Sequence, residues 1–170
     1  MALTGVRLVV PDVPVLDAAL DGPSALERVL GVGVVEGWSV FPGSFERIRS
    51  ELAADPGSAR WGTRLFVAGE PPALVGWGGF KGPPRDGTVE LGYAVAPARE
   101  GRGLATEAVR AMVREAFADP EVRAVIAHTL PEPGPSPRVL EKAGFAFAGD
   151  ATERGRVVWR FRILDGTLPA

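Results

Sequence analysis

The chain has 170 residues, 46% of them hydrophobic, and a net charge of −2, which suits one domain over residues 1–170 with a core of its own. The near-neutral charge gives no global positive field, so we expect neither nucleic acid nor a membrane as a partner. Cysteine is absent and His128 is the only histidine, which excludes disulfides, thiol catalysis and metal sites built on those residues, and we expect no metal.

The first part of the chain is predicted to form one strand followed by helices. Residues 6–10 are apolar and precede a proline, which favours a strand. Apolar residues at helical spacing predict a helix that runs to Leu30 and is split at Gly22-Pro23, and a second helix is predicted over 44–54. No apolar stretch is long enough for a signal peptide or for the roughly 18 residues of a membrane span, so we expect a cytoplasmic protein.

From Trp61 onward, strand patterns dominate. Three apolar stretches separated by glycine and proline turns predict an antiparallel meander at 64–68, 73–80 and 88–95. A helical period follows over 103–118, with its apolar positions on one face. The remaining predicted elements are a strand at 124–129, a short helix at 136–143 and two strands at 145–148 and 157–163.

The most informative stretch is the glycine loop that joins the strand at 88–95 to the helix at 103–118. Gly101 and Gly103 let the backbone turn its amides outward, and the small Ala105 allows close approach. Unpaired amides and the dipole at a helix N-terminus favour a phosphate or pyrophosphate. The alternative is a glycine loop that only begins a helix. A nicotinamide-binding unit fits poorly, because the preceding strands look antiparallel and no acidic residue ends the next strand at the required spacing.

These residues resemble the GCN5-related N-acetyltransferase (GNAT) family. The family's cofactor-loop motif is similar to Glu100-Gly101-Arg102-Gly103-Leu104-Ala105, and the strand that feeds it is similar to residues 90–97. Residues 136–145 resemble a second family signature, a short helix that closes on Gly-Phe. The N-terminal part is similar to the subgroup that acetylates the N-termini of ribosomal proteins.

The resemblance implies an α/β (α+β) fold, with a mixed, mostly antiparallel sheet of about seven strands that is splayed between the fourth and fifth strands and flanked by helices. The pantetheine arm of acetyl-CoA, the acyl donor, would lie in the gap against the backbone of Ala94 and Val95. The Val95 amide would hold the thioester oxygen as it becomes an oxyanion. The pyrophosphate would lie on the amides of Gly101, Arg102, Gly103, Leu104, Ala105 and Thr106, with the Arg102 side chain adding charge.

Two residues depart from the family pattern. Glu100 stands where the family usually has Gln or Arg, beside the proposed anion site, and Arg99 offers a compensating charge. Leu140 stands where many members have a tyrosine that protonates the departing thiolate. Tyr93 is the only tyrosine and is predicted on a strand, which argues against a tyrosine as the acid.

Acetyl transfer to an amine needs a deprotonated nucleophile, an oxyanion site and a proton source for the leaving thiolate. The resemblance makes Glu90 the first choice of base and Ser136 a candidate to hydrogen-bond or protonate the coenzyme sulfur. Glu90 could instead be an exposed carboxylate at a strand end. Ser136 is expected to cap its helix, with Pro137 at the first helical position, whether or not it has a catalytic role. His128 is a further candidate base, or a hydrogen-bonded structural residue.

We predict direct transfer from acetyl-CoA to a primary amine acceptor, either a protein N-terminus or a small molecule. A non-catalytic acyl-CoA-binding or sensing module and a structural protein with an unrelated glycine turn are the alternatives. A homodimer is compatible with the fold, although no residue indicates an interface. Five large aromatic residues either line an acceptor pocket or belong to the core: Trp38, Phe41, Trp61, Trp77 and Phe80.

Overall fold

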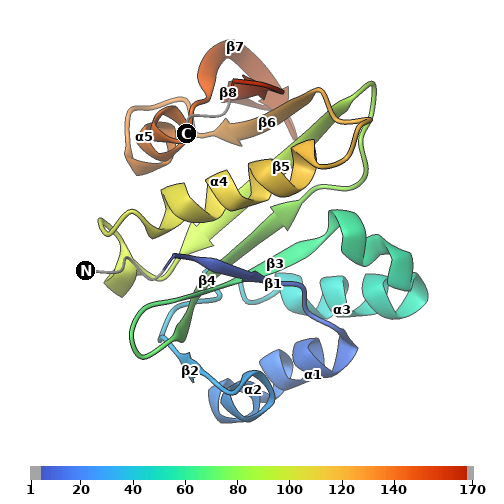
Figure 1. Cartoon of the computed structure of the whole chain (residues 1–170), viewed down its shortest axis with the longest axis vertical. Coiled ribbons are helices and arrows are strands. Elements are labelled where there is room, and N and C mark those ends of the chain that lie inside the picture. Colours follow the sequence, from blue (N-terminus) through green and yellow to red (C-terminus); the bar gives the residue numbers. More distant parts are fainter. Residues whose placement is uncertain (1–4, 168–170) are drawn as a thin grey trace.

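A mixed sheet of eight strands runs through the molecule with helices packed on both faces (Figure 1). The computed structural model describes residues 5–167. The strands are β1 (Arg7–Val9), β2 (Gly33–Val34), β3 (Thr63–Ala68), β4 (Ala73–Phe80), β5 (Thr88–Val95), β6 (Ala124–Thr129), β7 (Ala146–Glu153) and β8 (Arg156–Leu164). The helices are α1 (Val13–Asp21), α2 (Pro23–Leu30), α3 (Ser44–Ala54), α4 (Leu104–Phe117) and α5 (Pro135–Lys142), with short 3-10 turns η1 (Pro56–Trp61) and η2 (Pro97–Arg99).

The predicted elements are present, with differences at their ends. The N-terminal helix is split at Gly22, as predicted, and Asp12 caps α1 by accepting a hydrogen bond from the Val15 amide at 2.9 Å. The two-residue β2 and the turn η1 were not predicted, since neither is long enough to show a period. β7 extends to Glu153, well beyond the predicted 145–148, because its pairing with β8 sustains it despite a weak apolar pattern.

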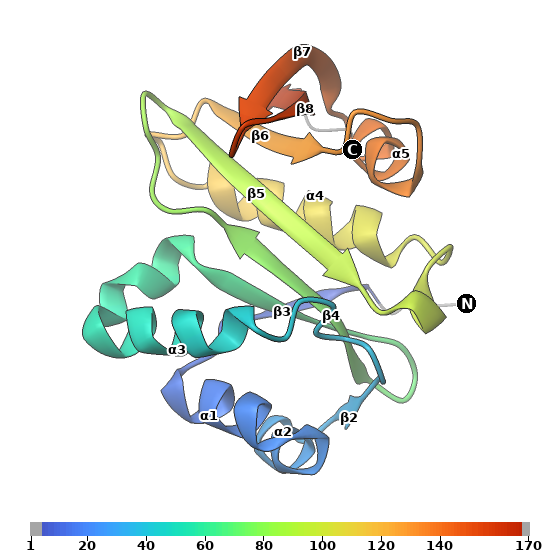
Figure 2. The same cartoon turned by 180° about the vertical axis from the view of Figure 1, so that it is seen from behind.

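The strand order is β1-β3-β4-β5-β6-β8-β7, and β2 lies beside β4. Most neighbours are antiparallel, but β2 is parallel to β4, and β5 is parallel to β6. β5 and β6 pair over three residues only, from Thr88–Ala124 to Glu90–Ile126. Beyond that point the two strands separate (Figure 2). This separation is the predicted splay. The prediction placed it between the fourth and fifth strands, which are β5 and β6 here because β2 was not predicted.

Two apolar clusters hold the helices against the sheet. On one face α4 packs a row of fully buried residues against the strands, including Val109, Met112 and Ala116 at helical spacing. On the other face α1, α2 and α3 enclose a second cluster around Leu16 and Phe45. Each fully buried large apolar side chain contributes about 1.5 to 3 kcal/mol relative to exposure, so both faces are firmly anchored. Within residues 5–167, no helix has the length and apolar character needed to cross a membrane.

One buried arginine holds the turn η1 in place. Arg64 on β3 is 3% exposed and pairs with Glu115 of α4 at 2.9 Å. Its other nitrogens donate to backbone carbonyls of the η1 region, including those of Ala59 and Arg60, both at 3.0 Å. A buried guanidinium with its donors paired is stable in place, so it holds η1 rigidly over the end of the sheet.

Candidate active site

The N-terminus of α4 is open to solvent and carries no side-chain cap. Gly101 and Gly103 adopt left-handed backbone conformations with φ of 72° and 78°, which glycine reaches without strain. A Cβ atom added to either glycine would meet nothing within 4 Å. The first amides of α4 have no partner within the helix, so the loop presents donors and a positive dipole end to the open space in front of it.

The charged residues near this loop differ in exposure and in hydrogen bonding. Glu107, in the first turn of α4, accepts a hydrogen bond from the Val6 amide at 3.1 Å, which ties the N-terminal segment to the helix. Glu100 and Arg102 are both exposed. The loop therefore keeps its backbone donors accessible while Glu107 is engaged in a structural contact.

Strand β5 points alternate backbone groups in opposite directions. The Lys81 amide donates to the Glu90 carbonyl at 2.9 Å, and the Ala96 amide donates to the Val75 carbonyl at 2.7 Å, so the even-numbered residues between them face β4. The odd-numbered residues 91, 93 and 95 face the side on which β6 has separated. The Val95 amide thus points into the splay, whereas the Ala94 carbonyl faces β4. An extended ligand could hydrogen-bond this edge as a strand would.

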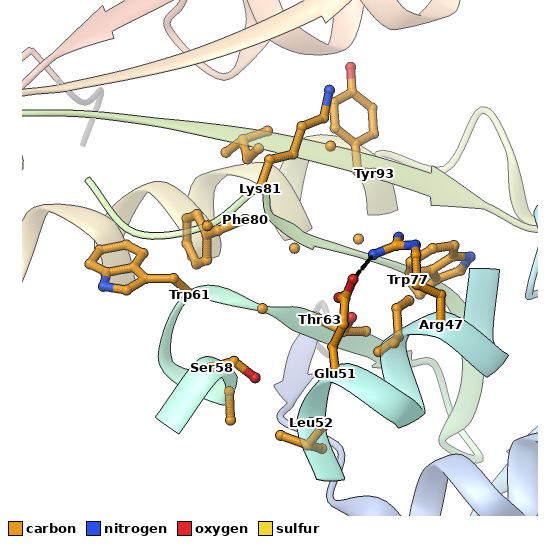
Figure 3. A pocket seen from close by; sticks show the side chains of 18 of the residues that line it. Arg47, Glu51, Leu52, Ser58, Trp61, Thr63, Trp77, Phe80, Lys81 and Tyr93 are labelled. Carbon is orange, nitrogen blue, oxygen red and sulfur yellow. Dashed lines mark hydrogen bonds and ion pairs between the residues drawn. The ribbon is translucent and has the colours of Figure 1, made fainter. Parts of the chain in front are cut away.

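A cavity of about 1020 Å³ opens on the face that carries α3, between that helix, η1 and strands β4 and β5 (Figure 3). The exposed ion pair between Arg47 and Glu51 of α3 lies at its edge. Of the five aromatic residues singled out in the sequence, four line the cavity: Phe41, Trp61, Trp77 and Phe80. Trp38 is 7% exposed and belongs to the core instead. Tyr93, His128 and Ser136 also line the cavity, so it reaches the splay.

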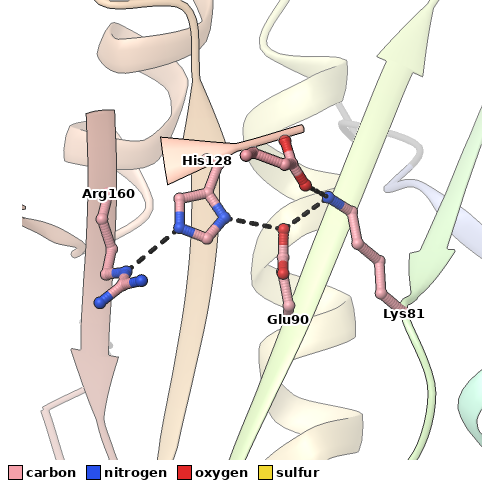
Figure 4. Close-up of polar contacts among 5 residues, drawn as sticks. Lys81, Glu90, His128 and Arg160 are labelled. Carbon is pink, nitrogen blue, oxygen red and sulfur yellow. Dashed lines mark hydrogen bonds and ion pairs between the residues drawn. The ribbon is translucent and has the colours of Figure 1, made fainter. Parts of the chain in front are cut away.

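Glu90 lies at the centre of a charged cluster beside this cavity (Figure 4). Its Oε1 atom accepts a hydrogen bond from Lys81 Nζ at 2.5 Å. The same atom lies 2.8 Å from His128 Nδ1. Arg160 Nε donates to His128 Nε2 at 3.1 Å. Because an arginine can only donate, Nε2 must be the acceptor and Nδ1 carries the proton, so the imidazole donates to Glu90.

These contacts set the charge state of the cluster. Burial tends to raise the pKa of Glu90, but the hydrogen bonds and charge of Lys81 and the hydrogen bond of His128 hold that pKa below its usual value. Burial likewise tends to lower the pKa of Lys81, and its contacts with Glu90 and with Glu153, at 3.2 Å, raise it overall. The contacts of Lys81 and His128 with the Glu90 carboxylate both involve Oε1, so Oε2 is left to accept from a substrate or a water.

The carboxylates of Glu90 and Glu153 and the ring of His128 have the spacing of a cation site, with one ligand atom from each within 4.8 Å of the others. Lys81 already brings a cation to the two carboxylates. Arg160 keeps the proton of His128 on Nδ1, the atom that a metal would need unprotonated. As built, the cluster suits an ammonium group better than a divalent ion.

Ser136 is the second residue of α5. The N-cap position belongs to Gly134, so no side chain caps this helix. The prediction that Ser136 caps this helix is therefore wrong; the helix begins earlier because Pro135 is suited to its first position. Ser136 is exposed and lines the cavity. Tyr93 spans the splay and donates from its hydroxyl to the Ser136 carbonyl at 3.0 Å. Burial raises the pKa of Tyr93, so the phenol stays protonated.

The sequence reasoning missed three members of the cluster: Lys81, Glu153 and Arg160. Glu153 and Arg160 lie on β7 and β8, far along the chain, and no local motif links them to Glu90. Lys81 could have been noticed in the sequence, because lysine is rare in this chain: only two of the 19 basic residues are lysines. Leu140 is fully buried, so the position where the family has a tyrosine is here a packing residue.

Comparison with known proteins supports the resemblance seen in the sequence. Residues 36–146 match the family model described as an acetyltransferase (GNAT) domain. The probable N-acetyltransferase YjcK of Bacillus subtilis is 39% identical over 74 residues, which cover 42% of this chain and 41% of that protein. The uncharacterized N-acetyltransferase YjdG of the same organism is 28% identical over 142 residues, or 82% of this chain and 84% of that protein.

Solved structures confirm the predicted fold. RimJ from Mycobacterium smegmatis, in complex with CoA-disulfide, superposes with a TM-score of 0.68 at 22% identity, covering 97% of this chain and 84% of that one. The aminoglycoside acetyltransferase AAC(6′)-Ib, in complex with coenzyme A and kanamycin, gives a TM-score of 0.65 at 19% identity, covering 95% and 96%. At such identities the likeness concerns the fold alone.

Proposed function

Because this chain belongs to the GNAT family of acetyl-CoA-dependent N-acetyltransferases, we propose that it transfers the acetyl group directly to a primary amine, either a protein N-terminus or a small molecule. The observation that carries the proposal is the splay of β5 from β6. It joins two features on opposite faces of the sheet: the open N-terminus of α4 and the cavity beside α3.

In this proposal acetyl-CoA binds along the open edge of β5. The amides of residues 101–106 hold the pyrophosphate, as the left-handed glycines and the uncapped helix start support. The pantetheine arm lies against the stretch containing Ala94 and Val95, with the Val95 amide as the donor that faces it. Arg102 adds a positive charge at the exposed rim, where its contribution is small because of solvent screening.

The amine enters from the cavity and meets the thioester at the splay. Glu90 accepts a proton from the amine through Oε2, directly or through a water, while Lys81 and His128 hold its other oxygen. The nitrogen attacks the carbonyl carbon, and the Val95 amide stabilises the oxyanion. The carbon–sulfur bond then breaks, and Ser136 hydrogen-bonds or protonates the leaving sulfur. Tyr93 is a positioning residue that holds the start of α5 against β5.

The lining of the cavity supports a cationic acceptor. Trp61 and Trp77 provide aromatic faces, which attract ammonium groups. Glu51 and Glu153 add carboxylates at the rim, where they balance the charges of Arg47 and Lys81. The resemblance of the N-terminal part to the ribosomal-protein subgroup favours a peptide N-terminus, and the likeness to an aminoglycoside acetyltransferase makes an aminoglycoside the small molecule to test first.

The test is titration calorimetry followed by turnover. We expect acetyl-CoA and CoA to bind with micromolar affinity, and thiol release from acetyl-CoA with at least one of a short basic peptide or kanamycin. Absence of acetyl-CoA binding would overturn the proposal.

The assignment of the base is tested separately. Glu90→Gln should lower the turnover rate about 100-fold with little change in acetyl-CoA affinity, because only proton acceptance is lost. Glu46→Gln, on the exposed face of α3, is the matched control and should turn over like the unmodified protein. Equal rates for the two variants would remove Glu90 as the base.

A further inference from the structure

Lys81 brings its amine to the point where β5 and β6 separate (Figures 3 and 4). Its side chain extends from the end of β4 across β5: a Cβ atom added to Gly92 would lie 3.9 Å from Lys81 Cε. Gly92 comes just after Glu90, the last β5 residue paired with β6. Lys81 also lines the cavity and is 48% exposed. The amine is thus on the acceptor side of the opening.

The contact between Lys81 and Glu90 has the geometry of an amine and its base. Lys81 Nζ is 2.5 Å from Glu90 Oε1, within the reach that proton transfer requires. An external amine deprotonated by Glu90 would have to approach the same carboxylate. Lys81 therefore occupies, within the chain, a place equivalent to the one that the proposed function gives to the acceptor.

We propose that Lys81 is itself an acetyl acceptor: with acetyl-CoA bound and no external amine present, the protein acetylates Lys81 Nζ of its own chain. This rests on the proposed function, since it uses the same donor, base and oxyanion site. Lysine acetylation removes the positive charge, so the product can no longer form ion pairs with Glu90 and Glu153.

The step is balanced without a further reactant. The Lys81 ammonium loses one proton to Glu90, and the free amine attacks the acetyl carbonyl carbon. A nitrogen–carbon bond forms, the carbon–sulfur bond breaks with its electron pair on sulfur, and the second proton lost by nitrogen ends on the thiolate. The products are an acetylated lysine, CoA as its thiol, and one proton passed from Glu90 to solvent.

The choice of lysine at this position supports the proposal. Arginine binds carboxylates through two parallel hydrogen bonds and would serve an ion pair with Glu90 and Glu153 at least as well. The chain uses lysine only at Lys81 and Lys142, and the neighbouring contact to His128 is made by an arginine, Arg160. What lysine supplies and arginine cannot is an amine that loses its proton.

The charge on Lys81 predicts how the reaction depends on pH. Contacts with the two carboxylates raise the pKa of Lys81 above that of a free lysine, even though burial opposes this, so only a small fraction is the free amine at neutral pH. Because the ammonium proton goes to Glu90, which is ionised throughout this range, and is not lost to solvent before the reaction, the rate of self-acetylation should change little between about pH 7 and 9.

The experiment incubates the full chain with acetyl-CoA alone and follows each amine by tandem mass spectrometry. Lys142, exposed near the end of α5, is an internal control for uncatalysed acetylation. We expect Lys81 to be acetylated at least about tenfold faster than Lys142, with a rate constant independent of protein concentration. Glu90→Gln should slow Lys81 acetylation and leave Lys142 unchanged, Lys142→Arg should leave Lys81 acetylation unchanged, and Lys81→Arg should lose the fast site.

Two results would overturn the inference. One is acetylation of Lys81 no faster than that of Lys142. The other is a rate constant proportional to protein concentration, which would make the reaction intermolecular. If either occurs while an external amine is still turned over, the proposed function stands and self-acetylation falls; if acetyl-CoA does not bind at all, both fall.

Discussion

The two edges of β5 are built in opposite ways. Toward β4 the strands approach so closely that glycine is required: a Cβ at Gly78 would lie 2.8 Å from Phe66 Cζ and 2.9 Å from Tyr93 Cα, and one at Gly76 would lie 2.9 Å from Val95 Cα. Toward β6 the pairing stops after three residues, and the glycines of the following loop face open space. One strand thus has a closed edge that holds the fold and an open edge that is free for a ligand.

This contrast separates two kinds of glycine that look alike in the sequence. Those on β4 make room for neighbouring backbone, so their substitution should reduce stability. Those in the loop before α4 provide left-handed conformations and an unobstructed surface, so their substitution should reduce ligand binding.

The largest effect is expected on the closed edge, from Gly78→Ala. The added Cβ has no space unless the strands move apart, so the free energy of unfolding should fall by about 3 kcal/mol. Urea denaturation measures this change. Gly92→Ala is the matched control, because its Cβ would meet only Lys81 Cε at an ordinary 3.9 Å. Similar losses in the two variants would contradict the distinction between the edges.

On the open edge, Gly103→Val should weaken acetyl-CoA binding about 100-fold, or about 2.8 kcal/mol, because the side chain would stand in front of the α4 amides. Calorimetry measures the affinity. Gly31→Val carries the same strain, since Gly31 has φ of 71° and open surroundings but lies at the end of α2. It should bind acetyl-CoA normally; unchanged affinity in Gly103→Val would remove the loop from the binding site.

Where the two edges meet, Glu90→Gln should cost about 1.5 kcal/mol of stability at neutral pH, because a carboxylate with charged partners becomes a neutral amide. Lys81 and His128 keep the pKa of Glu90 below its ordinary 4.5 in the folded protein. The stabilisation is therefore complete above pH 4.5 and is lost as the pH falls through the lower folded-state pKa. Unfolding curves at several pH values should show the two proteins converging in acid; a constant difference would contradict this.

The smallest effect should come from Tyr93→Phe, which removes the hydrogen bond across the opening. Its acceptor, the Ser136 carbonyl, belongs to an exposed residue, so water can replace the phenol and stability should fall by only about 0.5 kcal/mol. If Tyr93 positions α5, kcat should fall while acetyl-CoA affinity is kept. A rate equal to that of the unmodified protein would limit Tyr93 to packing.

The sequence predicted the parts of the fold that have a strong local signal. The apolar face of α4 and the turns that bound the meander of β3, β4 and β5 gave those elements nearly at their observed ends. The cap of α5 was misassigned because Pro135 and Pro137 both suit a helix start and only the structure distinguishes them. β7 was cut short because its extension depends on pairing with β8, a tertiary effect.

The candidate site was predicted only in part, for a related reason. The loop at Gly101 and Gly103 is contiguous in sequence, so its pattern is visible. The environment of Glu90 is assembled from β4, β6, β7 and β8, and a sequence gives no measure of which side chains share one carboxylate. Tyr93 was set aside because it lies on a strand, yet that strand faces the splay and brings its hydroxyl to α5.

The three-residue ladder between β5 and β6 has a mechanical consequence. It is the only direct strand pairing, among the described residues, between the sheet formed by β1 to β5 and the one formed by β6, β8 and β7. A ligand that hydrogen-bonds to both β5 and β6 in the splay would join the two half-sheets and restrict their relative motion. Within β5, the unliganded protein should then exchange the amide hydrogens of residues 91, 93 and 95 fastest, and a saturating ligand should raise the melting temperature of both halves together.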